Sequence, residues 1–169
     1  MSAPRRWIRA AVPGAIRIVL CALLLLIPSK APTSQGAAVP AARSEQADAL
    51  RRLHAAIESA FTRCDHTLLK SAFSTRVKTF LSSKALAVRQ GYYGADQAVL
   101  ILGRGFEGRT TLRFILSALD ESSPQSERTA LRARWLYREE GASKSEARLT
   151  FTLVPEGGTW CIREIREMK

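Results

Sequence analysis

Segments in which apolar and polar residues alternate one by one fill the C-terminal part of this 169-residue chain. The alternation runs from Leu112, from Leu131 and from Ala147, and a last segment begins at Thr159 after a Gly157-Gly158 turn. Period-two alternation is typical of antiparallel strands with one packed face and one wet face. Helical patterns precede these strands. This order predicts an α+β fold with N-terminal helices packed on a strongly curved antiparallel sheet.

Apolar side chains at three- and four-residue spacing predict the helices that come first. Ser44 and Asp65 are suitable N-caps, since both have short polar side chains that accept from backbone N–H groups. The expected elements, in chain order, are a helix over 44–63, a short helix after Asp65, strands over 76–81 and 85–90, and a helix over 95–105. The sequence contains no internal repeat and no low-complexity tract.

The N-terminus has the layout of a secretory signal. Arg5, Arg6 and Arg9 form a basic start, and the uninterrupted apolar run Ile18–Ile27 ends at Pro28. A helix that crosses a bilayer needs roughly 20 apolar residues, and this run is much shorter. A cleaved signal peptide is therefore favoured, and an uncleaved membrane anchor is the alternative.

The expected organisation is a signal peptide over 1–36, a flexible linker over 37–43 and one domain over 44–169. The linker is rich in Ala, Pro and Ser, without a periodic apolar pattern. Cleavage after Gly36 or Ala38 fits the small residues there. The mature protein is then exported, to the periplasm or the medium.

The charge of the mature part is lower than that of the whole chain. The chain has a formal charge of +11 from 26 basic and 15 acidic residues. Five of the basic residues and none of the acidic ones lie before residue 37, which leaves +6 for the rest. This excess favours acidic surfaces through the protein's field without identifying a partner.

Short motifs in the domain resemble those of a known group. These are Tyr92-Tyr93, Gln97-Ala98, Phe106 and the closing Gly158-Thr159-Trp160-Cys161-Ile162. With the order of elements, they resemble the nuclear-transport-factor-2-like (cystatin-like) superfamily, whose fold is cone-shaped, and within it the domain-of-unknown-function 4783 group. The resemblance covers nearly all of 49–168. It implies an exported bacterial protein without an assigned activity. The function that we expect for this chain is that of a small exported binding or scaffold module of unknown ligand.

Residues that could carry catalysis are few. His54 and His66 are the only histidines, and they occur without a Cys-x-x-Cys or His-x-x-x-His spacing or a Gly-x-Ser-x-Gly nucleophile elbow. Asp96 is expected to stabilise the first turn of its helix. We therefore expect no catalytic residues, no metal site and no cofactor, and a protein that is not an enzyme.

An enzyme remains the alternative. Some cone-fold enzymes, such as ketosteroid isomerase, place an acid/base group in an apolar pocket. The inward face of the predicted sheet carries no acid; it reads Leu112, Phe114, Trp135, Phe151 and Ile162. The candidate pocket-lining residues are Phe61, Tyr92, Tyr93, Phe114, Trp135 and Phe151, of which the two tyrosines are expected to close the mouth.

Two cysteines leave a further alternative open. An exported protein can form a disulfide, and Cys64 and Cys161 are the candidates. Cys64 lies on the core stripe of its helix, whereas Cys161 alternates with inward-facing Trp160 and Ile162 and should face out. A bulge near Arg163 would change this phase.

Arginines gather on the wet face of the predicted sheet. They are Arg113, Arg132, Arg134, Arg138, Arg148 and Arg163. An exposed sheet face is often simply charged, but arginine forks also suit phosphates and carboxylates. For an exported protein, an envelope protein or an anionic envelope surface is the natural partner, rather than nucleic acid. A homodimer formed through the sheet is a further expectation.

Overall fold

The structure, a computed structural model, describes the backbone of residues 38–118 and 128–169. All described elements belong to the unit Gln35–Lys169. They are α1 (Ala38–Arg63), the 3-10 helix η1 (His66–Ala72), β1 (Thr79–Ser83), β2 (Val88–Tyr93), α2 (Ala95–Phe106), β3 (Arg109–Ala118), β4 (Thr129–Glu139), β5 (Lys144–Glu156) and β6 (Thr159–Glu167). None of the described helices is both long and apolar enough to cross a membrane. The signal peptide predicted over 1–36 lies outside the described residues.

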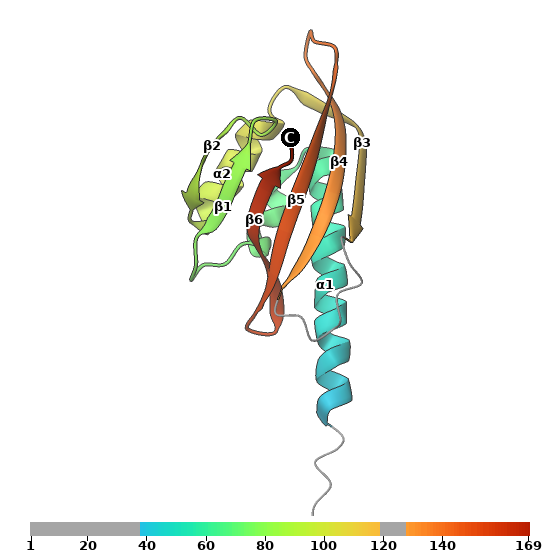
Figure 1. The fold of residues 1–169 in the computed structure, drawn as a ribbon, viewed down its shortest axis with the longest axis vertical. Coiled ribbons are helices and arrows are strands. Elements are labelled where there is room, and N and C mark those ends of the chain that lie inside the picture. The colour runs from blue at the N-terminus through green and yellow to red at the C-terminus, as the bar shows by residue number, and fades with distance from the viewer. Residues whose placement is uncertain (1–37, 119–127) are drawn as a thin grey trace, which may run out of the picture. The chain divides into compact units, whose positions relative to one another are not determined.

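One six-stranded sheet forms the frame, with strand order β2-β1-β6-β5-β4-β3. Figure 1 shows α1 and α2 on the same side of this sheet, while β4, β5 and β6 turn their other side to the viewer. We call the helix-covered side the inner face and the other side the outer face. The core lies between the inner face and the helices. The predicted α+β class is therefore confirmed, with a mostly antiparallel sheet.

The first helix begins earlier than predicted. It starts at Ala38 and not after Ser44, so that residues 38–43 are helical rather than a flexible linker. Alanine has the highest helix propensity, and Pro40 falls in the first turn, where a missing N–H costs no hydrogen bond. The predicted end near Arg63 agrees with the structure.

The second helix is a short 3-10 helix with the predicted cap. The Asp65 carboxylate accepts from the backbone N–H of Thr67 at 2.9 Å and from its hydroxyl at 2.6 Å. These hydrogen bonds lower the pKa of Asp65. Leu69 is fully buried, but Leu68 is 36% exposed, because a tighter helix presents fewer side chains to the core.

The first hairpin lies two to three residues later than predicted. Its turn comes after Ser83, and Ala87 takes a left-handed conformation with φ of 50°. Tyr92 and Tyr93 consequently end β2 instead of leading into the next helix. Strand β1 also pairs in parallel with β6, an arrangement that the sequence did not predict.

Two bulges set the phase of β3 and β6. The register between β3 and β4 shifts between Thr111 and Arg113, so Leu112 is the extra residue and lies 40% exposed. The prediction that Leu112 faces inward is therefore wrong. A second shift lies where Ile162 pairs with Leu153 and Glu164 pairs with Thr152. The bulge suspected near Arg163 is thereby confirmed.

Candidate functional site

The interior of the domain is filled by aromatic rings around Phe61. The centroid of Phe61 lies 4.7 Å from Phe114, 5.0 Å from Phe106, 5.3 Å from Trp135 and 5.6 Å from Phe151. Phe61, Trp135 and Phe151 have no exposed surface. The structure thus brings together four of the predicted pocket residues, as core rather than as the lining of an open pocket.

Polar groups in this interior satisfy one another. The Trp135 indole Nε1 donates to Thr111 Oγ1 at 2.8 Å, and the Thr111 hydroxyl donates to the Phe61 carbonyl oxygen at 2.5 Å. Sequence reasoning missed Thr111, because the bulge at Leu112 places it on the inner face. Among the described residues, no buried side-chain nitrogen or oxygen lacks a partner. These groups therefore hold the core together and offer no free hydrogen-bonding group to a ligand.

A charged cluster that the sequence did not reveal borders the same core. The Arg109 side chain is only 11% exposed, and its Nη2 lies 2.7 Å from Glu139 Oε1. Its Nη1 donates to the Gly105 carbonyl oxygen at 2.7 Å, and its guanidinium lies 4.9 Å from the Tyr137 ring centroid. Burial raises the pKa of Tyr137, although the charge of Arg109 opposes that shift. The arginine is engaged on three sides, which suits a structural role.

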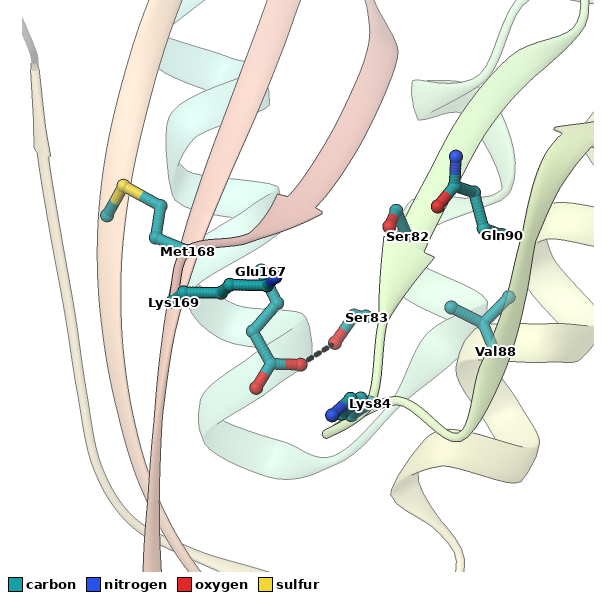
Figure 2. Close-up of a pocket in the computed structure, with 8 residues that line it drawn as sticks. All are labelled: Ser82, Ser83, Lys84, Val88, Gln90, Glu167, Met168 and Lys169. Carbon is teal, nitrogen blue, oxygen red and sulfur yellow. Dashed lines mark hydrogen bonds between the residues drawn. The ribbon is translucent and has the colours of Figure 1, made fainter.

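The depression shown in Figure 2 lies between the first hairpin and the end of β6. It has a volume of about 500 Å³ and is lined by Ser82, Ser83, Lys84, Val88, Gln90, Glu167, Met168 and Lys169. The Glu167 carboxylate accepts from the Ser83 hydroxyl at 2.9 Å and from the Ala85 backbone N–H at 2.8 Å. The only acid in this lining is thus used to hold the β1–β2 turn.

The two cysteines considered for a disulfide are both free in the structure. Cys64 Sγ lies 3.4 Å from Thr111 Oγ1, beside the core. Cys161 pairs with Val154 in the sheet and is 7% exposed. Burial raises the pKa of the Cys161 thiol, which keeps it protonated and weakly nucleophilic.

The two histidines and Asp96 lie on three different helices. His54 is on α1, and the His66 ring packs against Gly103 of α2, where an added Cβ would come within 3.1 Å of it. Asp96 is exposed in the first turn of α2, as predicted. Within residues 38–118 and 128–169, no group of three or more His, Cys, Asp or Glu side chains could hold a metal ion.

Most of the predicted arginines share the outer face. We call the following set the basic face: Arg113, Arg132, Arg134, Arg148 and Arg166. Arg166 was missed, because the bulge at Arg163 reverses the phase of β6. Arg138 points the same way near the end of β4, where it pairs with Lys144. Arg163 does not belong to the set, since its Nη1 donates to the Lys78 carbonyl oxygen at 3.1 Å.

Two acidic residues form ion pairs with arginines of the basic face. Arg134 Nη2 lies 2.7 Å from Glu146 Oε2, and Arg148 Nε lies 3.7 Å from Glu146 Oε1. This hydrogen bond from Arg134 lowers the pKa of Glu146 and raises that of Arg134. Glu164 pairs with Arg166 in the same way. Arg113 and Arg132 are exposed and have no ion-pair partner among the described residues.

Apolar side chains lie between the arginines. Arg113 pairs with Leu136 and Arg134 pairs with Ile115, so charged and apolar residues alternate across β3 and β4. These four residues line a hollow of about 80 Å³. The outer face can thus offer guanidinium groups together with some apolar contact.

Tyr92 lies on the outer face at the other edge of the sheet. It is 67% exposed, and its ring centroid is 5.1 Å from that of Phe80. The prediction that it closes the mouth of a pocket is therefore wrong. Tyr93 is half-buried, and its hydroxyl donates to the Arg89 carbonyl oxygen at 2.5 Å.

Known structures share this architecture, although no protein-family model and no curated protein matches the sequence. A protein of unknown function from Shewanella oneidensis, described as like nuclear transport factor 2, is 13% identical with a TM-score of 0.53; the match covers 73% of this chain and 98% of that one. A domain-of-unknown-function 4783 protein from Bacteroides ovatus is 15% identical with a TM-score of 0.51, covering 67% and 91%.

A third similar structure is a domain of unknown function with a cystatin-like fold from Nostoc punctiforme. It is 12% identical with a TM-score of 0.52, and the match covers 73% of this chain and 76% of that one. Sequence identities this low are evidence for a shared fold and not for a shared activity. The resemblance drawn from the sequence is thus confirmed at the level of the fold: this chain has the nuclear-transport-factor-2-like, or cystatin-like, fold that these proteins share.

Proposed function

We propose that the protein is an exported, non-enzymatic binding module that attaches to an anionic polymer or lipid surface outside the cytoplasm. Its working surface is the basic face. The observation that carries the proposal is the placement of five arginines on the helix-free side of adjacent strands, where Glu146 and Glu164 are the acids that pair with them.

The filled interior supports a binding module over an enzyme. Catalysis in a pocket of this kind needs a titratable group with a shifted pKa that a substrate can reach. The side chains of Thr111 and Trp135 are hydrogen-bonded to each other, and the Arg109 guanidinium is hydrogen-bonded to Glu139 and Gly105. The basic face, by contrast, is exposed and has guanidinium groups without an ion-pair partner in the described part of the chain.

The chemistry of the basic face favours an anionic ligand with repeated charges. Guanidinium groups donate in a planar fork that fits carboxylates and phosphates. The arginines occupy neighbouring strands, which lie about 4.7–4.9 Å apart, so a line of anionic groups could meet several of them at once. Exposed charge pairs are individually weak, and the affinity must therefore come from their number.

Export is the part of the proposal that rests on the sequence alone. The basic start and the apolar run Ile18–Ile27 support it. We expect the mature protein to begin between Gly36 and Arg43, because small residues suitable for cleavage lie there. Mass spectrometry of the protein from its native cells tests this. An intact chain that starts at Met1 and stays in the membrane would contradict it.

Binding to vesicles tests the proposed ligand class. The protein should bind vesicles that contain phosphatidylglycerol and should not bind vesicles of phosphatidylcholine alone. Binding should fall steeply as sodium chloride rises from about 0.05 M to about 0.5 M, since salt screens exposed charges. Polyglutamate as competitor separates a general anionic polymer from a lipid-specific site. Equal binding to neutral vesicles, or binding that salt does not change, would contradict the proposal.

A further inference from the structure

Strand β3 forms one edge of the sheet. In the strand order it follows β4 and has no neighbour on its other side among the described strands. From Arg113 to Ser117 its pairing with β4 is regular, after the bulge at Leu112. The outward backbone groups of an edge strand are unpaired within the sheet and can template another strand.

The opposite edge is protected in ways that β3 is not. Strand β2 has six residues, an irregular register with β1 and a glycine, Gly91, in its middle. The Tyr93 hydroxyl also occupies the Arg89 carbonyl oxygen. Short, bulged or charged strands are the usual protection of sheet edges. The regular part of β3 contains a single charged residue, Arg113, and the exposed Ile115.

We propose that β3 pairs antiparallel with β3 of a second copy, with Ile115 at the two-fold axis. This pairing does not depend on the anion-binding proposal. Centring on Ile115 pairs the whole regular segment 113–117 with itself. Arg113 then lies opposite Ser117 of the second copy, and Phe114 lies opposite Leu116. No two arginines meet, and apolar residues meet on both faces, which favours cross-strand pairing.

Other registers fit less well. A shift by one residue would pair an outward side chain with an inward one, and would turn the second copy over. Centring on Arg113 would place two guanidinium groups directly opposite each other, which is destabilising. In the proposed register both outer faces lie on the same side. The two basic faces would then join into one surface, which would raise avidity for a repeating anionic ligand.

Substitution of Ile115 tests whether the protein dimerises through β3 rather than through another surface. The parent protein should be a dimer by light scattering after gel filtration at tens of micromolar. Ile115→Lys should be a folded monomer, because two lysines would meet at the axis while the side chain still points to solvent. Leu100→Lys is the matched control, since Leu100 is 61% exposed on α2, and it should remain a dimer. A monomeric parent, or a dimeric Ile115→Lys variant, would overturn the proposal.

A cysteine at the axis tests the register. Directly opposite residues of an antiparallel pair have Cα atoms about 4.5–5.5 Å apart, within the range that a disulfide spans. Ile115→Cys should therefore give a cross-linked dimer under mild oxidation. The parent, which has Cys64 and Cys161, and a Leu136→Cys variant one strand further in should not. Cross-linking of Leu136→Cys as efficient as that of Ile115→Cys would overturn the register.

Discussion

Replacing Trp135 by alanine is expected to lower the free energy of unfolding by about 3–5 kcal/mol, the usual range for a large aromatic side chain in a packed core. Trp135 has no exposed surface, stacks on Tyr137 at 4.3 Å and meets Phe61 edge-on at 5.3 Å. Its indole also donates to Thr111, so truncation removes a buried hydrogen bond as well. Urea unfolding followed by circular dichroism measures the loss.

Trp160 provides the matched control for this truncation. It is half-buried at the start of β6, and its Nε1 donates to the Gln46 carbonyl oxygen at 3.1 Å on the surface. Trp160→Ala should therefore cost less than half as much as Trp135→Ala. A loss below about 1 kcal/mol for Trp135→Ala would mean that the interior is loosely packed. The enzyme alternative would then be the better account.

Valine at Gly105 is expected to lower the free energy of unfolding by about 1–3 kcal/mol, the usual cost of overpacking. Glycine inside a helix is less stable than alanine by about 1 kcal/mol, so a larger residue would stabilise an open site. At Gly105 an added Cβ would lie 3.0 Å from the Leu86 carbonyl oxygen and 3.1 Å from its Cα. Backbone atoms cannot give way cheaply, and α2 would have to move. Thermal and urea unfolding measure the change.

Gly103 is the comparison site, because an added Cβ there would meet a side chain rather than backbone atoms. An added Cβ there would meet the His66 ring at 3.1 Å. Gly103→Ala should cost less than Gly105→Val, and that cost should vanish when His66 is also replaced by alanine. The His66 change should leave the cost of Gly105→Val unaltered. If Gly105→Val were as stable as the parent, the close packing of α2 on the β1–β2 turn would be contradicted.

The regular strands could be predicted from the sequence because their signal is local. Along β4 and β5, side chains alternate between buried and exposed as the sequence predicts. The change of phase between Ile162 and Ile165 in the sequence also indicates the bulge in β6. In each case the pattern of apolar and polar residues shows which face of the sheet each side chain occupies.

The predictions fail where contacts between segments distant in the sequence determine the local structure. No local feature of Thr111-Leu112-Arg113 marks a bulge, since all of these residues fit a strand. The parallel pairing of Leu81 with Ile165 depends on how the sheet closes, which no local pattern specifies. Tyr92 reaches the outer face because it pairs with Phe80, which lies beside the outward-facing Glu164.

The candidate site was predicted in part for the same reasons. Arg132, Arg134 and Arg148 lie on regular strands, so their shared face followed from alternation. Arg163 lies in the bulge of β6 and so leaves the outer face. Arg166 follows the bulge and lies on the outer face instead. The cluster of Arg109 and Glu139 pairs the two ends of a hairpin, and only the register reveals it.

The central claim is that binding occurs on the basic face, and a comparison of two triple variants tests it most directly. The first replaces by glutamine three basic-face arginines, Arg113, Arg132 and Arg148. The second makes the same change at three exposed arginines of the helices, Arg52, Arg63 and Arg104. Both variants lose the same net charge, and circular dichroism must show both to be folded.

The measurement is the dissociation constant for phosphatidylglycerol vesicles at low salt. Each basic residue near an anionic surface contributes about 1 kcal/mol, so the basic-face variant should bind at least about tenfold more weakly than the parent. The helix variant should stay within about threefold, the effect of net charge alone. Equal losses in the two variants would contradict the account, since binding would then follow overall charge and not the face that the sheet presents.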